Sequence, residues 1–356
     1  MKTIGLILAG GCGTRFWPLS RAKRPKQVLK LDGDKEMINF TIDRCSPLIP
    51  KEDIYLVTNR DQAELLQEVT GSRMEPGRIF VEPSARNTAP CILYSALRLR
   101  KKYGDAVLCV LSSDQSVKKE EEFRRVLSEA SDYAQSHDDI VTVGITPTFP
   151  STGYGYIKTG SMVSGSDTVH HVDRFVEKPD LETASEYLHS GGYLWNSGMF
   201  ISRISTIVDR FRQHLPEMFQ ALSPLEHLSD EEAGPFLRKV YPTLEKISID
   251  YGIMEKESHI AVIPGDFGWS DIGAWDTLGD VIPPDAGGNV IKGDHVGLDT
   301  RDCVVFSGDK TVATIGLSNV VVVNTPDSVL VCSKDNVQEI RQLTDELKRM
   351  GREDLL

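Results

Sequence analysis

A glycine-rich turn followed by a cluster of cations is the clearest chemical signal in the chain. Residues 9–27 are AGGCGTRFWPLSRAKRPKQ, and residues 10–30 contain no acidic side chain. The cations in this stretch are Arg15, Arg21, Lys23, Arg24, Lys26 and Lys30. Glycines allow successive backbone N–H groups to point at one anion, and they leave no side chain to block its approach. The stretch therefore predicts a site for a phosphorylated ligand, with a solvated basic loop as the alternative.

The spacing of the glycines separates this turn from two common phosphate-binding motifs. A dinucleotide-binding fold requires G-x-G-x-x-G running into a helix. Here the third glycine is missing after Gly11 and Gly13, and Pro18 interrupts any helix. The Walker A pattern is absent as well. The remaining pattern favours a triphosphate clamp without a following helix, and it disfavours a dehydrogenase.

Two aspartates that follow apolar stretches are candidates for a metal site. Asp114 comes shortly after an expected strand at 106–111, and Asp271 lies in the segment WSDIG at 269–273. A carboxylate at the carboxyl end of a parallel strand is well placed to hold Mg²⁺ between phosphate oxygens, because this cation prefers oxygen ligands. The alternative for either residue is a turn or a helix cap.

Charge, cysteine usage and hydropathy limit the class of protein. The 356 residues carry a net charge of −12, which argues against a general binder of nucleic acid or membrane surfaces. No apolar run approaches the roughly 20 residues of a membrane helix, and the run at 4–9 is too short for a signal peptide. The scattered cysteines predict reduced thiols and a cytoplasmic protein. They are Cys12, Cys45, Cys91, Cys109, Cys303 and Cys332.

Apolar runs alternate with amphipathic helical patterns over the first 145 residues. The expected strands are 4–9, 54–58, 78–81, 106–111 and 140–144, and the expected helices are 36–45, 61–69, 88–102 and 120–135. This alternation predicts an α/β fold, with a mostly parallel sheet covered on both faces. Ligands of such sheets bind beyond the carboxyl ends of the strands.

The pattern changes twice in the rest of the chain. Residues 153–199 predict strands and turns, and residues 204–254 predict a helical region. After Pro283 and Pro284, the β-rich runs 290–292, 303–306, 311–315, 320–323 and 329–332 are closed by a charged helix at 336–350. We therefore expect two domains, 1–284 and 285–356.

Several segments, in the same order, resemble the nucleotide-sugar pyrophosphorylases. LAGGCGTRFWPLSRAKRPKQ looks like the first motif of that family, and FWPLS at 16–20 and PKQ at 25–27 resemble its mannose-1-phosphate guanylyltransferase branch. The later matching segments are EPSARNTAP at 82–90, FVEKP at 175–179, WNSGMF at 195–200 and WSDIGAW at 269–275. The resemblance covers about 280 residues, and the tail looks like the short β-helix-like end of the family.

The resemblance implies a fold and a reaction. The fold is a Rossmann-like, glycosyltransferase-A-like catalytic domain with a small left-handed β-helix-like domain after it. The reaction joins GTP and α-D-mannose 1-phosphate to give GDP-mannose and diphosphate, with Mg²⁺ as cofactor. Because the attacking phosphate oxygen is already ionised, no general base is needed, and catalysis consists of positioning and charge neutralisation.

The resemblance also assigns roles to individual residues. Arg15 and Lys26 would be catalytic, stabilising the leaving diphosphate and the α-phosphoryl charge, and Asp114 and Asp271 would hold Mg²⁺. Residues implied in nucleotide binding are Leu8, Ala9, Gly10, Gly11, Gly13, Thr14, Glu82, Arg86, Asn87, Thr88 and Ser113, and guanine would lie near 82–88. The family more often has Pro-Ser-Asp-His around the metal-binding aspartate, whereas this chain has Ser113 and Gln115 beside Asp114.

Four further residues are implied in binding the sugar phosphate. Glu177 would accept hydrogen bonds from sugar hydroxyls, and Lys178 would meet the phosphate. A strand places adjacent side chains on opposite faces, so this pair needs a bend to reach one site, and Pro179 provides it. Gly155, between two tyrosines, would allow close backbone approach to the hexose, and Asn196 offers an amide that both donates and accepts. The alternative for Glu177 and Lys178 is a surface ion pair.

Other functions stay open at this stage. The substrate could be another sugar phosphate, such as manno-heptose 1-phosphate, or another nucleotide. A catalytically silent sensor of nucleotide sugars is disfavoured, because Lys26 and both aspartates are present. The histidines include no H-x-H pair, so no fused isomerase domain of the cupin kind is expected. We expect a homodimer and no nucleic-acid or membrane partner.

Overall fold

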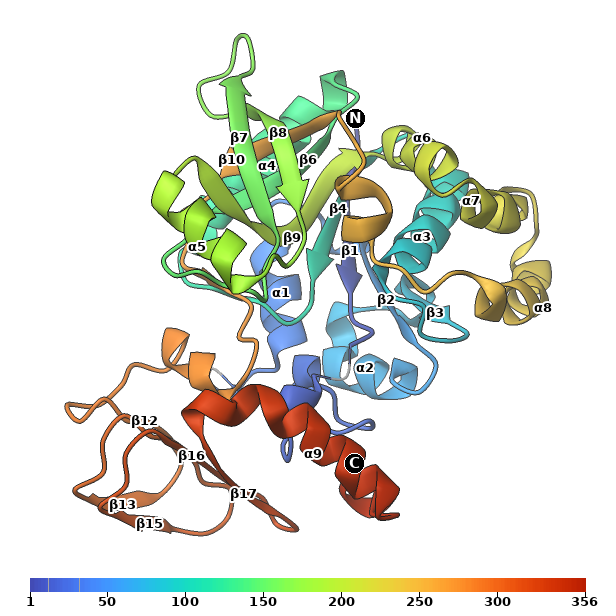
Figure 1. Ribbon diagram of the computed structural model, residues 1–356. Coiled ribbons are helices and arrows are strands. Elements are labelled where there is room, and N and C mark those ends of the chain that lie inside the picture. The colour runs from blue at the N-terminus through green and yellow to red at the C-terminus, as the bar shows by residue number, and fades with distance from the viewer. Residues whose placement is uncertain (12, 32) are drawn as a thin grey trace.

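A computed structural model describes residues 1–11, 13–31 and 33–356. The prediction of a reduced thiol at Cys12 therefore lies outside the described residues. The other five cysteines are free thiols, as the sequence predicts. The largest sheet has nine strands in the order β3-β2-β1-β4-β9-β6-β10-β8-β7 (Figure 1).

The first half of this sheet is parallel and follows the predicted alternation. Its strands are β1 (Thr3–Leu8), β2 (Ile54–Asn59), β3 (Ile79–Glu82) and β4 (Val107–Ser112). The helices between and after them are α1 (Met37–Cys45), α2 (Ala63–Thr70), α3 (Thr88–Tyr103) and α4 (Glu120–Ser136). Leu8 lies beside Val57 and Ser112 in the register, so the strands end at one edge, where the site must lie.

The second half of the sheet is largely antiparallel. Its strands are β6 (Ile140–Ile145), β7 (Tyr156–Met162), β8 (His170–Val176), β9 (Tyr193–Arg203) and β10 (Ile260–Pro264). Strand β9 runs antiparallel between β4 and β6, and β10 pairs parallel with β6. The prediction of only strands and turns over 153–199 is wrong at α5 (Leu181–Ser190), a helix that Asp180 caps by accepting a hydrogen bond from the Thr183 N–H.

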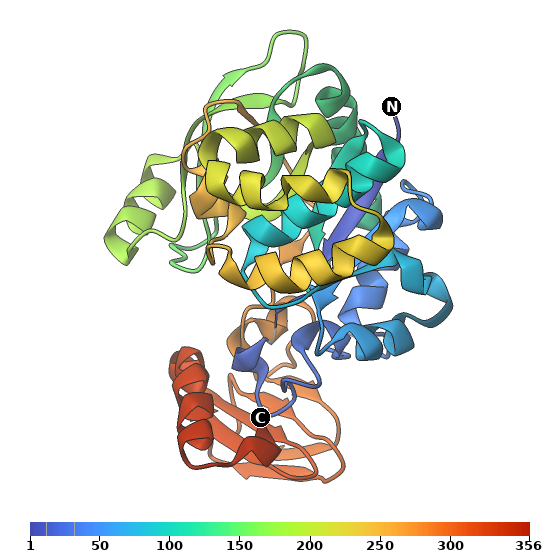
Figure 2. The ribbon, with the colours of Figure 1, turned by 90° about the vertical axis from the view of Figure 1, so that its right-hand side faces the viewer.

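Helices cover both faces of the sheet, as predicted. The helical region after β9 contains α6 (Ile204–His214), α7 (Pro216–Leu222), α8 (Asp230–Val240) and a π-helical turn, Asp250–Met254. Figure 2 shows α6, α7 and α8 stacked with α3 on one face. This face and the opposite face, which packs against α1, α2, α4 and α5, each bury a separate apolar core.

The C-terminal part is a small β-helix-like unit with parallel strands. Strands β12 (Val290–Lys292), β14 (Val304–Phe306) and β16 (Val320–Asn324) form a parallel ladder, and β17 (Val329–Ser333) adds antiparallel to β16. Strand β13 (His295–Leu298), which was not predicted, pairs with β15 (Val312–Ile315). A 3₁₀ turn, Lys334–Glu339, leads into α9 (Ile340–Arg349).

A third apolar core joins the two ends of the chain. It contains Phe16 and Trp17 from the cation-rich stretch, Trp275, and apolar residues of the β-helix-like unit such as Val304 and Ile340. In both views the first helical turns of the chain lie beside α9 (Figures 1 and 2). None of the helices described is long and apolar enough to cross a membrane.

Candidate active site

The glycine turn lies beyond the carboxyl end of β1, and side chains from two other segments hold its backbone. The carbonyl of Ala9 accepts hydrogen bonds from Gln27 Nε2 (3.0 Å) and Thr58 Oγ1 (2.8 Å). The carbonyl of Gly10 accepts one from Asn59 Nδ2 (3.2 Å). These bonds fix the path of the turn, so the turn is preorganised for a ligand.

Gly13 brings the following basic loop, defined here as residues 13–31, back against this turn. Its φ of 61° is left-handed, and a Cβ at this position would lie 2.3 Å from Lys26 Cβ. Glycine is therefore needed both for its backbone conformation and for space. Lys26 begins the 3₁₀ turn Lys26–Val28 and is only 5% exposed. The alternative of a solvated basic loop is wrong for Lys26.

Lys26 connects the two aspartates that the sequence assigned to a metal. Its ammonium donates to Asp114 Oδ2 (3.0 Å) and to the backbone carbonyl of Asp271 (2.5 Å). The two aspartates meet because β5 (Ser116–Val117) pairs with β11 (Trp269–Ser270). A short antiparallel ladder thus places a cation and two carboxyl groups at the edge where β1 and β4 end.

The carboxyl group of Asp271 is the more enclosed of the two. Burial raises its pKa, while Lys26 and a hydrogen bond from Tyr154 Oη to Asp271 Oδ1 (2.9 Å) act in the opposite direction. The neighbouring carboxylate of Asp114 adds to the increase. Burial next to this carboxylate also raises the pKa of Tyr154, so Tyr154 stays a hydrogen-bond donor.

The carboxyl groups brought together where β5 pairs with β11 fit a hard cation that arrives with a phosphorylated substrate. No group of three or more His, Cys, Asp or Glu side chains that could hold a metal occurs among residues 1–11, 13–31 and 33–356. A cation such as Mg²⁺ is typically held by one or two protein carboxylates, with substrate phosphates and water completing its shell. Asp114 and Asp271 supply two carboxylates of this kind.

Arg15 and Thr14 lie on the outer side of the basic loop. Both are exposed, in the 3₁₀ turn Thr14–Phe16. Arg15 Nη1 donates to the carbonyl of Gly273 (3.2 Å), two residues after Asp271. The guanidinium therefore lies on the same side as the aspartate pair, whereas Thr14 does not line the cavity between the glycine turn and the start of α3.

A cavity of about 350 Å³ opens between the glycine turn, the end of β4 and the start of α3. The predicted residues that line it are Leu8, Gly10, Gly11, Glu82, Arg86, Asn87, Thr88, Ser113 and Asp114. Gln27, which the PKQ motif contains but which was given no role, and Lys246, which no motif contains, also line it. Ser113 is held in place because its N–H donates to the carbonyl of Leu8 (3.1 Å).

Glu82 places a carboxyl group at the base of this cavity. Burial raises its pKa to about 7, and Tyr241 Oη donates a hydrogen bond to its Oε1. Its Oε2 lies 3.6 Å from where a Cβ of Gly10 would be, so the carboxyl group faces the glycine turn. Glu82 can accept a hydrogen bond when ionised and donate one when neutral.

The other three residues of this region are partly committed to the fold. Arg86 donates to the carbonyl of Pro242. Asn87, with φ 68°, caps α3 by accepting a hydrogen bond from the Thr88 N–H (2.8 Å). Thr88 Oγ1 accepts a hydrogen bond from the Ile249 N–H (2.9 Å). Their role toward a base stays a prediction.

The predicted sugar residues meet on the antiparallel half of the sheet. Lys178, with φ 45°, donates to Glu177 Oε1 (2.7 Å). The Asn196 N–H donates to the carbonyl of Gly155 (2.8 Å), and Asn196 Nδ2 donates to Asp250 Oδ1 (3.0 Å). A Cβ on Gly155 would lie 2.5 Å from Glu177 Oε2. The four residues thus form one cluster, to which the structure adds Asp250.

Glu177 and Asp250 form a buried acidic pair within this cluster. Burial and the charge of Glu177 raise the pKa of Asp250, while Lys178 and the hydrogen bond from Asn196 oppose the increase. Glu177 is 9% exposed. The alternative of a surface ion pair between Glu177 and Lys178 is therefore wrong, because the Glu177 carboxyl group is buried. Such a cluster offers hydrogen-bond acceptors that suit the hydroxyls of a sugar.

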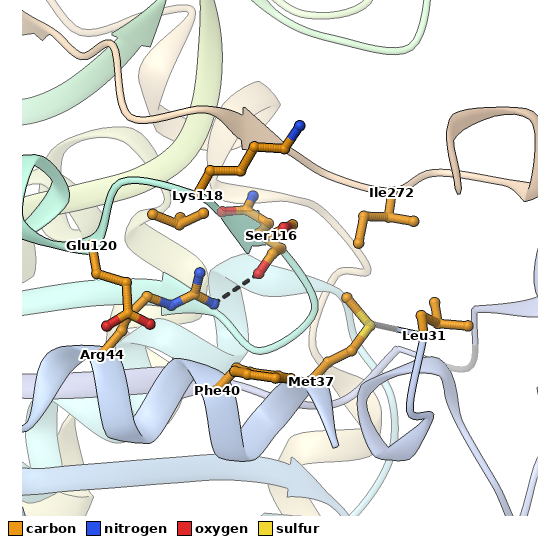
Figure 3. A pocket seen from close by; sticks show the side chains of 10 residues that line it. Leu31, Met37, Phe40, Arg44, Ser116, Lys118, Glu120 and Ile272 are labelled. Carbon is orange, nitrogen blue, oxygen red and sulfur yellow. Dashed lines mark hydrogen bonds between the residues drawn. The ribbon is translucent and has the colours of Figure 1, made fainter. Parts of the chain in front are cut away.

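Helix α1 supports the segment around Asp114 through two side chains. Arg44, 4% exposed, donates to the carbonyl of Gln115 (2.7 Å), and Thr41 Oγ1 donates to the carbonyl of Ser113 (3.4 Å). Figure 3 shows Arg44 reaching from α1 toward this segment, beside a second cavity of about 190 Å³. The backbone on both sides of Asp114 is therefore bound.

The sequence motifs assigned no role to Gln27, Tyr154, Lys246 and Asp250. Tyr154 and Gln27 stand directly beside predicted residues, so their positions were a usable signal. Asp250 and Lys246 come from the helical region, and no motif marked them. Their place in the site depends on the fold, which brings this region of the chain back to the edge of the sheet.

The strands of this sheet thus end beside a glycine turn and a lysine held between two aspartates. The chain belongs to the nucleotidyl transferase family, whose profile matches residues 4–286. A profile described as a MannoseP isomerase/GMP-like beta-helix domain matches residues 293–347.

Individual relatives match almost the whole chain. The xanthan biosynthesis protein XanB of Xanthomonas campestris pv. campestris (strain B100) is 39% identical over 98% of this chain and 73% of its own length. The mannose-1-phosphate guanylyltransferase RfbM of Salmonella typhimurium is 37% identical over 99% and 74%. A crystal structure of a mannose-1-phosphate geranyltransferase from Thermus thermophilus is 38% identical, with a TM-score of 0.88, and covers 98% of this chain and 100% of that chain.

Proposed function

We propose that this nucleotidyltransferase is a mannose-1-phosphate guanylyltransferase, which converts GTP and α-D-mannose 1-phosphate into GDP-mannose and diphosphate. The observation that carries the proposal is the position of Lys26. Its ammonium binds both the Asp114 carboxylate and the Asp271 carbonyl. Asp114 lines the proposed nucleotide cavity beside the glycine turn. Asp271 accepts a hydrogen bond from Tyr154, the neighbour of Gly155 in the sugar cluster. The likeness to RfbM, named for this activity, supports the choice of substrates.

The reaction follows from the charges of the substrates. An oxygen of the sugar phosphate attacks the α-phosphorus of GTP, a new P–O bond forms, and the bond to the β-phosphate oxygen breaks as diphosphate leaves. The attacking oxygen carries a negative charge already, so the protein needs no base. Its task is to hold two repelling anions in line and to neutralise the charge that develops.

The chain's cations and backbone take up the phosphates in this proposal. In the glycine turn, Gly10, Gly11 and Gly13 would offer backbone N–H groups to the triphosphate. Leu8, Ala9, Thr14 and Ser113 would border the phosphates in other ways, since the N–H groups of Ala9 and Ser113 already donate to the carbonyls of Val57 and Leu8. Lys26 stabilises the α-phosphoryl group, and Arg15 stabilises the leaving diphosphate from the outer side of the loop. A preorganised cation costs little reorganisation during the reaction, which is why its contribution to the rate is large.

Asp114 and Asp271 are the residues that would hold Mg²⁺. When bound, this cation supplies further charge neutralisation between the two phosphate groups. The role of the protein is to keep both carboxyl groups in place: Tyr154 binds Asp271, and Lys26 binds Asp114.

The two ends of the site would select the base and the sugar. Glu177, Asn196 and Gly155 would contact the hexose hydroxyls, and Lys178 would meet the sugar phosphate. Guanine would lie against Glu82, Arg86, Asn87 and Thr88. Guanine offers N–H donors at N1 and N2, which a carboxylate can accept, whereas adenine offers no such pair.

Diphosphate release from the purified protein with Mg²⁺ tests this proposal. Four nucleoside triphosphates are crossed against mannose, glucose and manno-heptose 1-phosphates. We expect turnover with GTP and mannose 1-phosphate. Turnover with a different pair would overturn the substrate assignment and keep the mechanism. No turnover with any pair, in protein shown to be folded, would overturn the enzymatic assignment in favour of a nucleotide-sugar sensor.

Two predictions concern the protein outside the site. We propose that it is a homodimer, which light scattering coupled to gel filtration measures directly, and that it acts in the cytoplasm. A single-chain mass of 39.5 kDa in solution would contradict the dimer.

A further inference from the structure

The C-terminal end of the chain is bonded to the basic loop that carries Arg15 and Lys26. Trp17 Nε1 donates to the backbone carbonyl of Leu355 (2.8 Å), across 338 residues of sequence. Figure 1 shows the last helix, α9, lying beside the first turns of the chain. One side of the basic loop is therefore in contact with C-terminal residues that lie outside the catalytic motifs.

The strongest polar contact between these regions is an ion pair. Arg21 donates from Nη1 and Nη2 to the two carboxylate oxygens of Asp327, at 2.9 and 2.7 Å, and from Nη2 to Ser328 Oγ (3.1 Å). Two parallel bonds between a guanidinium and a carboxylate fix an orientation as well as a distance. The hydrogen bonds from Arg21, Thr325 and Ser328 lower the pKa of Asp327 to about 2, so the pair stays charged at neutral pH.

Apolar packing joins the same two regions. The rings of Phe16 and Trp275 lie 5.1 Å apart, and those of Trp275 and Phe306 lie 5.7 Å apart. Trp275 Nε1 donates to the carbonyl of Trp17 (3.1 Å). Phe16 and Trp17 directly follow Arg15, so the residues on which Arg15 depends are packed into the core shared with the β-helix-like unit.

The basic loop is stiff enough to transmit this contact. Arg21 and Arg24 exchange two backbone hydrogen bonds of 2.9 Å, which close a tight turn between Arg15 and Lys26. Ser20 Oγ donates to the carbonyl of Gly13 (2.6 Å). Arg21 also donates from Nε to the carbonyl of Pro18 (3.0 Å). A displacement at Arg21 would therefore move the chain on both sides of it.

We propose that the C-terminal segment 325–355 positions the basic loop for catalysis, with Arg21 and Asp327 as the positioning residues. The inference rests on the proposed function, because Arg15 and Lys26 are the cations whose position it sets. Arg21 and Asp327 touch no reacting atom. Their effect comes from alignment, and misplacing a reactive group by about 1 Å can lower a rate by roughly a hundredfold.

A double-mutant cycle with Arg21→Gln and Asp327→Asn tests the inference. Each single variant is expected to lower kcat about tenfold, with the KM for mannose 1-phosphate unchanged within twofold, because the sugar cluster lies on other elements. The double variant is expected to fall no more than twofold below either single variant, because the second change removes nothing further. Two independent tenfold losses that multiply would overturn the pairing.

Glu346→Gln is the matched control, because it removes an exposed ion pair with Arg349 within α9 of the same C-terminal region. It is expected to leave kcat unchanged. If it lowers kcat as much as Asp327→Asn does, general loosening of the C-terminal region explains the loss, and the assignment to Arg21 and Asp327 fails.

Hydrogen–deuterium exchange supplies a readout that does not depend on activity. Asp327→Asn is expected to speed amide exchange in peptides covering 13–31 and to leave peptides from β6 and β10 unchanged. Unchanged exchange in 13–31, together with wild-type kcat, would overturn the inference. An inactive wild-type protein would instead overturn the proposed function, and the exchange result would still decide whether the C-terminal segment holds the loop.

Discussion

The proposed phosphate end of the site takes most of its residues from one stretch of chain, whereas the proposed sugar end draws on four separate elements. Gly10, Gly13 and Lys26 lie within 17 residues of sequence. Gly155, Glu177, Asn196 and Asp250 lie before β7, after β8, in β9 and in a π-helical turn. The first end presents backbone groups and cations, and the second presents mostly neutral and acidic groups, with Lys178 as its cation.

This difference follows from the ligands. A phosphate is a compact anion that backbone N–H groups and one or two cations can surround. The hydroxyls of a hexose point in several directions, so their partners must come from several directions as well. Changes at the phosphate end should therefore act on the rate, and changes at the sugar end on the affinity for one substrate.

Lys26→Met is the largest expected loss and tests the phosphate end. Removing one preorganised group that stabilises transition-state charge typically costs about 10²–10³-fold in kcat, and we expect this range here. The KM for mannose 1-phosphate should change little. Lys23→Met removes the same charge from an exposed position of the same loop and should be near wild type. A Lys26→Met enzyme with an unchanged single-turnover rate would remove Lys26 from the mechanism.

Asp114→Asn tests the seam between the two ends. An amide oxygen is a poorer ligand than a carboxylate, so the Mg²⁺ concentration for half-maximal rate should rise about 10–100-fold, the range typical of lost metal-site partners. A Mg²⁺ titration of the initial rate measures it. Asp132→Asn, an exposed change on α4, is the control. A titration curve that coincides with that of the wild type would show that Asp114 is not a ligand.

Gly155→Ala isolates the sugar end. The new Cβ would lie 2.5 Å from Glu177 Oε2 and 3.3 Å from Asn196 Cβ, so the carboxyl group must move. We expect the KM for mannose 1-phosphate to rise about tenfold, as loss of one hydrogen bond with a charged group implies, with the KM for GTP unchanged. Gly153→Ala meets only an ordinary contact of 3.6 Å with Ser151 Oγ and should behave as the wild type. Equal increases in both KM values would argue against separate ends.

Glu82 gives an effect of a different kind, one measured on stability and not on turnover. Its pKa is about 7 in the folded protein because of burial, and near 4.3 when unfolded. Between these two pKa values the unfolded chain binds fewer protons at this group than the folded protein does. The contribution of Glu82 to the free energy of unfolding therefore falls as pH rises through this window, by roughly 4 kcal/mol in total. Urea unfolding at pH 5 and pH 8 should show that Glu82→Gln removes this loss. Glu64→Gln, at an exposed position, should keep it. Identical pH dependence in all three proteins would contradict the buried carboxyl.

The parallel half of the sheet was predictable because its signals are local. The expected strands and helices up to residue 145 agree with β1 to β4, β6 and α1 to α4 to within two residues at each end. Apolar runs of about six residues between amphipathic helices are typical of buried parallel strands. Helix α5 was not found because only Ala184 and Tyr187 are buried in it, which leaves a weak apolar stripe.

By itself, the sequence determined the phosphate end of this protein. Gly13 can adopt a left-handed turn that other residues resist, and the loop returns Lys26 to it within 13 positions. The tertiary structure alone decided which distant groups meet there. The pairing of β5 with β11 places Asp271 near Asp114. The π-helical turn places Asp250 beside Asn196. Asp327, from the other end of the chain, binds Arg21. These contacts depend on strand register and on the burial of paired polar and charged groups. Neither produces a periodic pattern in the sequence from which the contact could be predicted.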